Sequence, residues 1–146
     1  MPASTGEQRD SLIVGNALCE LPRVSAWVHD WAAWQHLPER VAVNLDLCST
    51  EVVTNIVTHA GGDGAQRIVL HLGWQDGDVA LDVEDEGREF DIRQVPEPVR
   101  ATCLEDAKVG GWGIPMVRHF SDGLRYRHEG GRNRLTLFFR AAAPPP

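Results

Sequence analysis

The run from Ser49 to His59 constrains this chain most, because it spaces Glu51, Asn55 and His59 four residues apart. Side chains at these intervals lie along one face of an α-helix. The positions between them are largely apolar, which predicts a packed face beside the polar strip: Val52, Val53, Ile56 and Val57. A carboxylate accepts protons, and an amide oxygen is a hard ligand suited to Mg²⁺. The strip is therefore either a solvated helix face or one edge of a binding site.

Two further helices are predicted on either side of this strip. Apolar residues recur at helical spacing from Leu21 to His36, and the tryptophans of this segment are expected in the core: Trp27, Trp31 and Trp34. Pro38 suits the first turn of the next helix, which carries the polar strip and is expected to end near Gly61-Gly62. The third helix is predicted over Gly113 to Phe120.

Alternation of apolar and polar residues predicts two hairpins. One spans residues 67–84 around Asp76-Gly77, a strong turn signal, and the other spans residues 124–139 around Gly130-Gly131. A short apolar run in 11–19 is expected to add a strand. We therefore predict an α+β fold, a two-layer sandwich with a mixed, mostly antiparallel sheet and helices on one face.

The chain length of 146 residues suits one domain over 11–140, preceded by a flexible segment 1–10 and followed by a tail 141–146. Prolines interrupt a long irregular segment within it, about 88–109, which is expected to form a lid. The formal charge of −7 argues against bulk nucleic-acid binding. Three cysteines without paired spacing, and no apolar leader or membrane span, predict a cytoplasmic protein.

Two more segments carry chemically useful residues. In Glu84–Asp91, an acidic residue leaves a predicted strand and is followed by a glycine, so its carboxylate can face a pocket while the backbone turns. In Gly110–Arg118, glycines precede a helix, where backbone N–H groups favour anions. This second segment lacks the ending of a P-loop. Taken singly, a charged turn and a plain glycine turn explain the two segments as well as a site does.

In this order the three motifs resemble the ATP-binding domain of the GHKL (Bergerat-fold) family, which includes gyrase and histidine kinases. The resemblance covers about Leu45 to Phe139. Its details are similar to those of stand-alone serine kinases that act as bacterial anti-sigma factors. The shared forms are Glu-x-Val-Thr-Asn-x-x-x-His at Glu51–His59, Asp-x-Gly-x-x-Phe-Asp at Asp85–Asp91, and Gly-Arg-Asn-x-Leu-Thr-Leu at Gly131–Leu137.

This resemblance implies a role for each motif residue. Glu51 would be the general base, and Asn55 would bind the Mg²⁺ that bridges the ATP phosphates. Asp85 would accept a hydrogen bond from the adenine amino group, and Gly87 would let adenine lie against the backbone. Thr136 would support adenine through Asp85 or a bound water.

The resemblance also implies that the third motif lines the phosphates, with the helix opening behind it: Gly110, Gly111, Gly113 and Ile114. Lys108 and Arg118 would either add positive charge near the γ-phosphate or be solvated at the surface. His59 would either take part in catalysis or only hold the end of its helix. Trp112 places a large side chain between the phosphate-loop glycines, where it would either pack on the lid or restrict the pocket.

The function that the resemblance implies is an ATP- and Mg-dependent serine/threonine protein kinase of the anti-sigma type. It would phosphorylate a STAS-type anti-anti-sigma protein and bind a sigma factor in its other partner state, without contacting nucleic acid or membrane. The resemblance also admits a homodimer. The alternative is a nucleotide-gated regulatory binding module with little or no kinase activity. Glu51 favours the kinase, because a pure binding module needs no base. A third alternative is the catalytic half of a histidine kinase, which is less favoured because a dimerisation segment with a phospho-accepting histidine is not expected within these residues.

Overall fold

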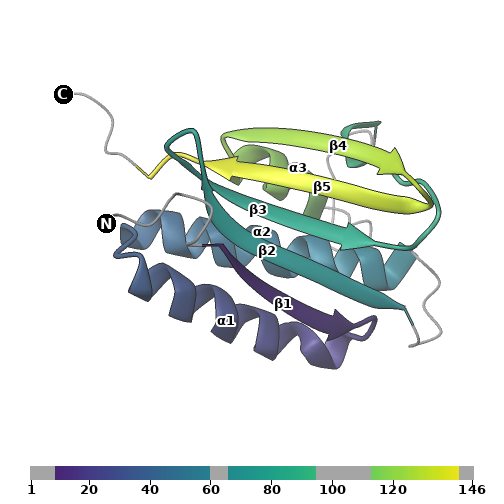
Figure 1. The fold of residues 1–146 in the computed structure, drawn as a ribbon, viewed down its shortest axis with the longest axis horizontal. Coiled ribbons are helices and arrows are strands. Elements are labelled where there is room, and N and C mark those ends of the chain that lie inside the picture. The colour runs from purple at the N-terminus through teal and green to yellow at the C-terminus, as the bar shows by residue number, and fades with distance from the viewer. Residues whose placement is uncertain (1–8, 60–65, 95–112, 142–146) are drawn as a thin grey trace, which may run out of the picture.

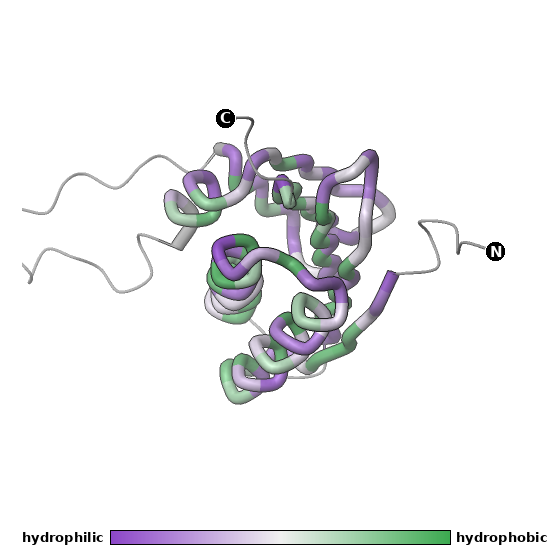
Figure 2. The backbone as a smooth tube through the Cα atoms, turned by 90° about the vertical axis from the view of Figure 1, so that its left-hand side faces the viewer, coloured by the Kyte–Doolittle hydropathy of each residue, from purple (hydrophilic) through white to green (hydrophobic). Residues whose placement is uncertain are grey.

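The computed structural model describes residues 9–59, 66–94 and 113–141. These residues form two layers, a five-stranded sheet and three α-helices (Figure 1). The strands are β1 (Asp10–Gly15), β2 (Arg67–Gln75), β3 (Asp78–Asp85), β4 (Gly123–Glu129) and β5 (Arg132–Phe139). The α-helices are α1 (Leu21–Trp34), α2 (Glu39–His59) and α3 (Gly113–Phe120), and two short 3-10 helices are η2 (Leu18–Glu20) and η3 (Ile92–Gln94). The view in Figure 2, turned by 90°, shows the helices together on one side of the sheet.

The strand order is β1-β2-β3-β5-β4, and every pair of neighbours is antiparallel. The predicted α+β sandwich is confirmed, and the sheet that we expected to be mixed is antiparallel in all its described pairs. The turn between β2 and β3 has positive φ at Asp76 (53°) and Gly77 (86°), and that between β4 and β5 has positive φ at Gly130 (62°) and Gly131 (76°). Two-residue turns of this hand match the twist of the strands, so both predicted hairpins form where their turn residues are.

The core lies between the sheet and the helices. Strand β2 buries alternate residues Ile68, Leu70 and Leu72, and β3 buries Leu81 and Val83. Helix α2 covers them with residues at helical spacing: Val41, Leu45, Cys48 and Val52. The alternate residues of the strands and the helically spaced residues of α2 thus form one apolar layer. This layer packs α2 against the sheet.

Two expectations near the N-terminus were wrong. The strand predicted over 11–19 ends at Gly15, because the Glu20 carboxylate accepts the Gly15 N–H at 2.8 Å and the chain turns into η2. Trp34, expected in the core, is 70% exposed, whereas Trp31 is buried. At about 100° per residue, Trp34 lies about 60° around the helix from Trp31, on the side away from the buried Val28 and Ala32, and α1 ends there.

The remaining organisational predictions fall mostly on residues outside the described ranges. These are the N-terminal segment and the C-terminal tail, the end of α2 near Gly61-Gly62, and the part of the lid after residue 94. The start of the predicted lid is described and contains η3, a single helical turn. In the described part of the chain, no helix is both long enough and apolar enough to cross a bilayer.

Candidate functional site

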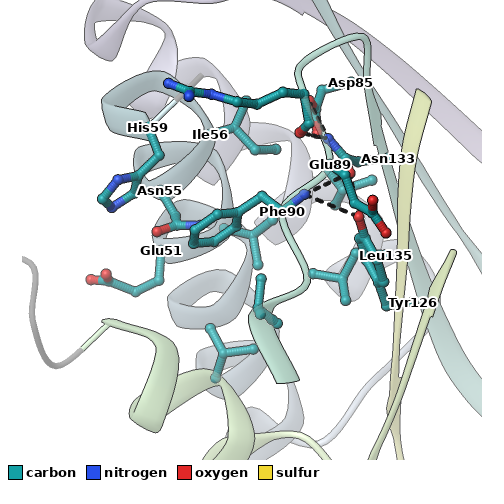
Figure 3. A pocket seen from close by; sticks show the side chains of 15 residues that line it. Glu51, Asn55, Ile56, His59, Asp85, Glu89, Phe90, Tyr126, Asn133 and Leu135 are labelled. Atoms are coloured by element: carbon teal, nitrogen blue, oxygen red, sulfur yellow. Dashed lines mark hydrogen bonds between the residues drawn. The ribbon is translucent and has the colours of Figure 1, made fainter. Parts of the chain in front are cut away.

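A cavity of about 330 Å³ opens between α2 and the sheet (Figure 3). Three segments far apart in sequence supply most of its wall: α2, the end of β3 with residues 88–92, and the β4–β5 hairpin. The first two predicted motifs therefore meet in one place. Glu51 and Asn55 lie on one wall, and Asp85 lies on the other.

The α2 wall carries the whole polar strip. Glu51, Asn55 and His59 line the cavity, and the figure shows all three projecting from the same helix face. Glu51 and Asn55 are half-buried and His59 is exposed. Val52 and Ile56 lie beside them at the cavity floor, because α2 turns its apolar face to the sheet. The strip thus lines a cavity, with His59 at its solvent-exposed end.

Asp85 is a buried carboxylate at the end of β3, where only 8% of its surface is exposed. Its Oδ1 accepts hydrogen bonds from the Gly87 backbone N–H at 2.8 Å and from Asn133 Nδ2 at 3.2 Å. Among the described residues no hydrogen bond reaches its other oxygen, Oδ2. The carboxylate is therefore held in place by one oxygen and can accept from a ligand with the other.

Asn133 on β5 is a site residue that sequence reasoning missed. Its Nδ2 also donates to the carbonyl oxygens of Arg88 at 2.8 Å and Gly87 at 3.3 Å. Its Oδ1 accepts from the Phe90 N–H at 3.2 Å and from the Tyr126 hydroxyl. Burial raises the pKa of Tyr126, which keeps this hydroxyl protonated as a donor. Asn133 lies directly opposite Asp85 in the pairing of β3 with β5. A prediction of that strand register would have identified Asn133 as a site residue.

Thr136 does not take the role expected of it. Its hydroxyl donates to Asp82 on the opposite face of the sheet, and its neighbour Leu135 lines the cavity instead. Side chains alternate along a strand, so residues 133 and 135 share the cavity face and residue 136 faces away. The contact with Asp85 that we expected from Thr136 is made by Asn133.

The third motif lies largely outside the described residues, including Lys108, Gly110, Gly111 and Trp112. Helix α3 spans Gly113–Phe120, the bounds predicted from the sequence, so Gly113 is its first residue and Ile114 follows it. Arg118, for which we considered a solvated position or one near phosphate, is half-buried and donates to the Ile92 carbonyl at 2.7 Å. It therefore ties α3 to the segment that follows β3.

Replacing Asn133 by alanine should lower the free energy of unfolding by about 2–3 kcal/mol, because several buried polar groups lose a partner at once. Urea denaturation followed by circular dichroism measures this change. Arg132→Ala is the matched control on the same strand, since the side chain of Arg132 makes an exposed ion pair with Glu86 at 3.4 Å and no other hydrogen bond or ion pair with the described residues. A loss at Asn133 no larger than the control's would contradict the network.

Cys48 lies on the buried side of α2, next to the site. Burial, reinforced by the nearby charge of Glu51, raises the pKa of this thiol to about 12. The thiolate is the reactive form, so Cys48 should be alkylated by iodoacetamide at pH 8 on the order of 100-fold more slowly than the exposed Cys19. Peptide mass spectrometry measures both rates in one sample. In urea the two rates should converge, and equal rates in the folded protein would show that Cys48 is accessible.

Comparison with known proteins places this chain in a family. Residues 16–139 match the family described as the histidine kinase-like ATPase domain. The chain is 34% identical over 117 residues to the serine/threonine-protein kinase BtrW of Bordetella bronchiseptica, covering 80% of this chain and 82% of that protein. It is 29% identical over 89 residues to the anti-sigma F factor of Pasteuria penetrans, covering 59% of each chain.

A solved structure supports the same assignment at the level of the fold. The crystal structure of the RsbU and RsbW domains of Rv1364c from Mycobacterium tuberculosis superposes with a TM-score of 0.66 and 20% sequence identity. The match covers 92% of this chain and 33% of that one. The resemblance that the three motifs predicted is thus confirmed. The chain belongs to the histidine kinase-like ATPase family, and its relatives include a bacterial serine/threonine-protein kinase and an anti-sigma factor.

Proposed function

We propose that this protein is an ATP-dependent serine/threonine protein kinase of the anti-sigma type. The observation that carries the proposal is the convergence of Glu51, Asn55 and Asp85 on one cavity, since these are a base, a metal ligand and a purine acceptor. The relatives named as a serine/threonine-protein kinase and as an anti-sigma factor support it.

Adenine recognition would rest on Asp85. Its Oδ2 would accept from the exocyclic amino group of adenine, while Gly87 keeps the backbone close enough for the ring to lie against it. Apolar side chains complete the walls that a flat base needs: Ile56, Val83 and Leu135. Because the carboxylate is buried and held by Gly87 and Asn133, it is oriented before the nucleotide arrives.

The phosphates would lie near Asn55. The described residues contain no group of three His, Cys, Asp or Glu side chains that could hold a metal by themselves. Mg²⁺ that is shared with ATP phosphates needs only one or two protein ligands, so the amide oxygen of Asn55 fits this role. When bound, Mg²⁺ supplies charge neutralisation for the transferring phosphoryl group. Gly110, Gly111, Gly113, Ile114 and Lys108 remain proposed as the phosphate loop.

Glu51 would act as the general base for phosphoryl transfer. Its carboxylate takes the proton of the acceptor Ser or Thr hydroxyl as that oxygen attacks the γ-phosphorus. The bond between the γ-phosphorus and the bridging oxygen of ADP breaks, and ADP leaves with the electron pair. The acceptor is oriented by its own protein, so this chain needs to supply only the base, the metal ligand and the binding pocket.

The partners follow from the kinase assignment. We infer that the phosphorylated substrate is a STAS-type anti-anti-sigma protein and that the other partner state holds a sigma factor in the cytoplasm. The anti-sigma F factor relative supports this inference. Phosphorylation of the antagonist would then decide which of the two partners the protein binds.

Incubation with Mg-ATP and the STAS proteins encoded in the same genome tests the proposal. Mass spectrometry of each STAS protein should show one phosphorylated Ser or Thr that depends on ATP and on this protein. Binding of ATP without transfer to any of them would favour the nucleotide-gated binding module instead. Absence of both binding and transfer would contradict the proposed function.

A further inference from the structure

Residues 87–93, here called the strap, follow β3, and residues 88–90 and 92 line the cavity. Their backbone is held on the sheet side by Asn133, which bonds the carbonyls of Gly87 and Arg88 and the N–H of Phe90. Tyr126 also accepts the Phe90 N–H at 3.1 Å. The strap is therefore attached to β4 and β5 at its centre.

The far end of the strap is attached to α3 and β4. Arg118 donates to the Ile92 carbonyl, and the Arg93 guanidinium lies 5.7 Å from the centre of the Tyr126 ring. Arg93 also pairs with Asp91 at 2.7 Å. These contacts fix the strap relative to the sheet and α3, but none of them reaches α2.

The side chain of Phe90 makes the connection to α2. Its ring stacks on the imidazole of His59, with ring centres 5.3 Å apart and planes 10° from parallel. Figure 3 shows Phe90 extending from the strap across the cavity toward the helix strip. Both residues line the cavity, so this stack spans the gap between its two walls.

We propose that His59 is a positioning residue that acts through Phe90. Its ring holds Phe90 against the end of α2. This contact sets the distance between the strap and the cavity wall that carries Glu51 and Asn55. Stacking needs a flat π surface and no exchangeable proton. In this role His59 neither takes part in the chemistry nor only holds the end of its helix, the two alternatives that the sequence left open. The functional consequence rests on the proposed nucleotide site, whereas the stack itself does not.

Hydrogen exchange of the nucleotide-free full chain tests the stack directly. In His59→Ala, amides of the strap peptide should exchange about three- to tenfold faster, because the ring contact that ties the strap to α2 is lost. His59→Phe should restore the wild-type rate. Thr58→Ala, the neighbouring exposed residue on α2, should leave the rate unchanged. Unchanged exchange in His59→Ala would overturn the proposal.

Nucleotide kinetics test the consequence. His59→Ala and Phe90→Ala should each raise KM for ATP about three- to tenfold with kcat within about twofold, and the double variant should be no worse than either single one. His59→Phe should behave as wild type. Failure of His59→Phe to restore KM would show that an imidazole nitrogen matters, and tighter binding by Phe90→Ala would show that the ring obstructs the ligand. Either result overturns the proposal.

The two measurements separate this inference from the proposed function. If the wild-type protein binds no adenine nucleotide, the proposed function fails, and the exchange rates of the strap still decide whether His59 holds Phe90. If nucleotide binds and turns over but the strap exchanges equally fast in wild type and His59→Ala, only the inference fails.

Discussion

Replacing Glu51 by glutamine is expected to slow phosphoryl transfer by about 10²–10⁴-fold, the range that a lost general base costs. The substitution keeps the size and hydrogen-bonding reach of the side chain but removes its ability to take the hydroxyl proton. Glu51 lies at the cavity edge and shares no hydrogen bond with Asp85, so binding of ATP should change little. A phosphotransfer assay with radiolabelled ATP and the STAS substrate gives the rate, and calorimetry gives the affinity.

The control for this variant is Glu39→Gln. Glu39 lies in the first turn of the same helix, is exposed, and is outside the cavity, so it removes the same charge from α2 without touching the site. Its transfer rate should stay within about twofold of wild type. A Glu51→Gln protein that transfers phosphate at the wild-type rate would remove Glu51 from the mechanism and would favour a base supplied elsewhere.

Replacing Asp85 by asparagine is expected to weaken ATP binding by about 100-fold or more, because a buried charged acceptor is lost and an amide N–H₂ replaces it. The remaining amide oxygen can still accept the Gly87 N–H, so the fold should survive. Guanine carries a keto oxygen where adenine carries its amino group. The wild-type preference for ATP over GTP should therefore shrink or invert in Asp85→Asn.

Calorimetric titration with ATP and GTP measures both effects. Asp82→Asn is the matched control, since Asp82 lies on the same strand but bonds Thr136 on the other face of the sheet. It should leave both affinities within about threefold of wild type. If the ATP to GTP ratio in Asp85→Asn equals that in Asp82→Asn, the adenine assignment is wrong.

Much of the fold could be predicted because its signals are local. The Asp76-Gly77 and Gly130-Gly131 turns adopt the left-handed backbone that their residues favour, and this places both hairpins. The i, i+4, i+8 spacing of the polar strip likewise depends only on α2 being helical. The prediction for Trp34 was wrong because the buried face of α1 is centred on Val24, Val28 and Ala32, and Trp34 lies to one side of it.

The site was predictable only in part, for the same reason. Glu51, Asn55 and Asp85 lie in motifs whose residues are close in sequence, and all three face the cavity. Thr136 and Asn133 are in one motif as well, but the face that each presents depends on how β5 pairs with β3. A shift of one residue in that pairing would turn each side chain to the other face of the sheet.

The sequence by itself therefore determined the elements, the hairpins and the chemistry of the strip, since each follows from residues within a few positions of one another. Only the tertiary structure decided which partners those residues meet. The Asp85 carboxylate accepts a hydrogen bond from Asn133, and the Arg118 guanidinium donates to the Ile92 carbonyl. The His59 ring stacks on Phe90. These contacts join segments that lie far apart along the chain, and strand register and helix packing set their geometry.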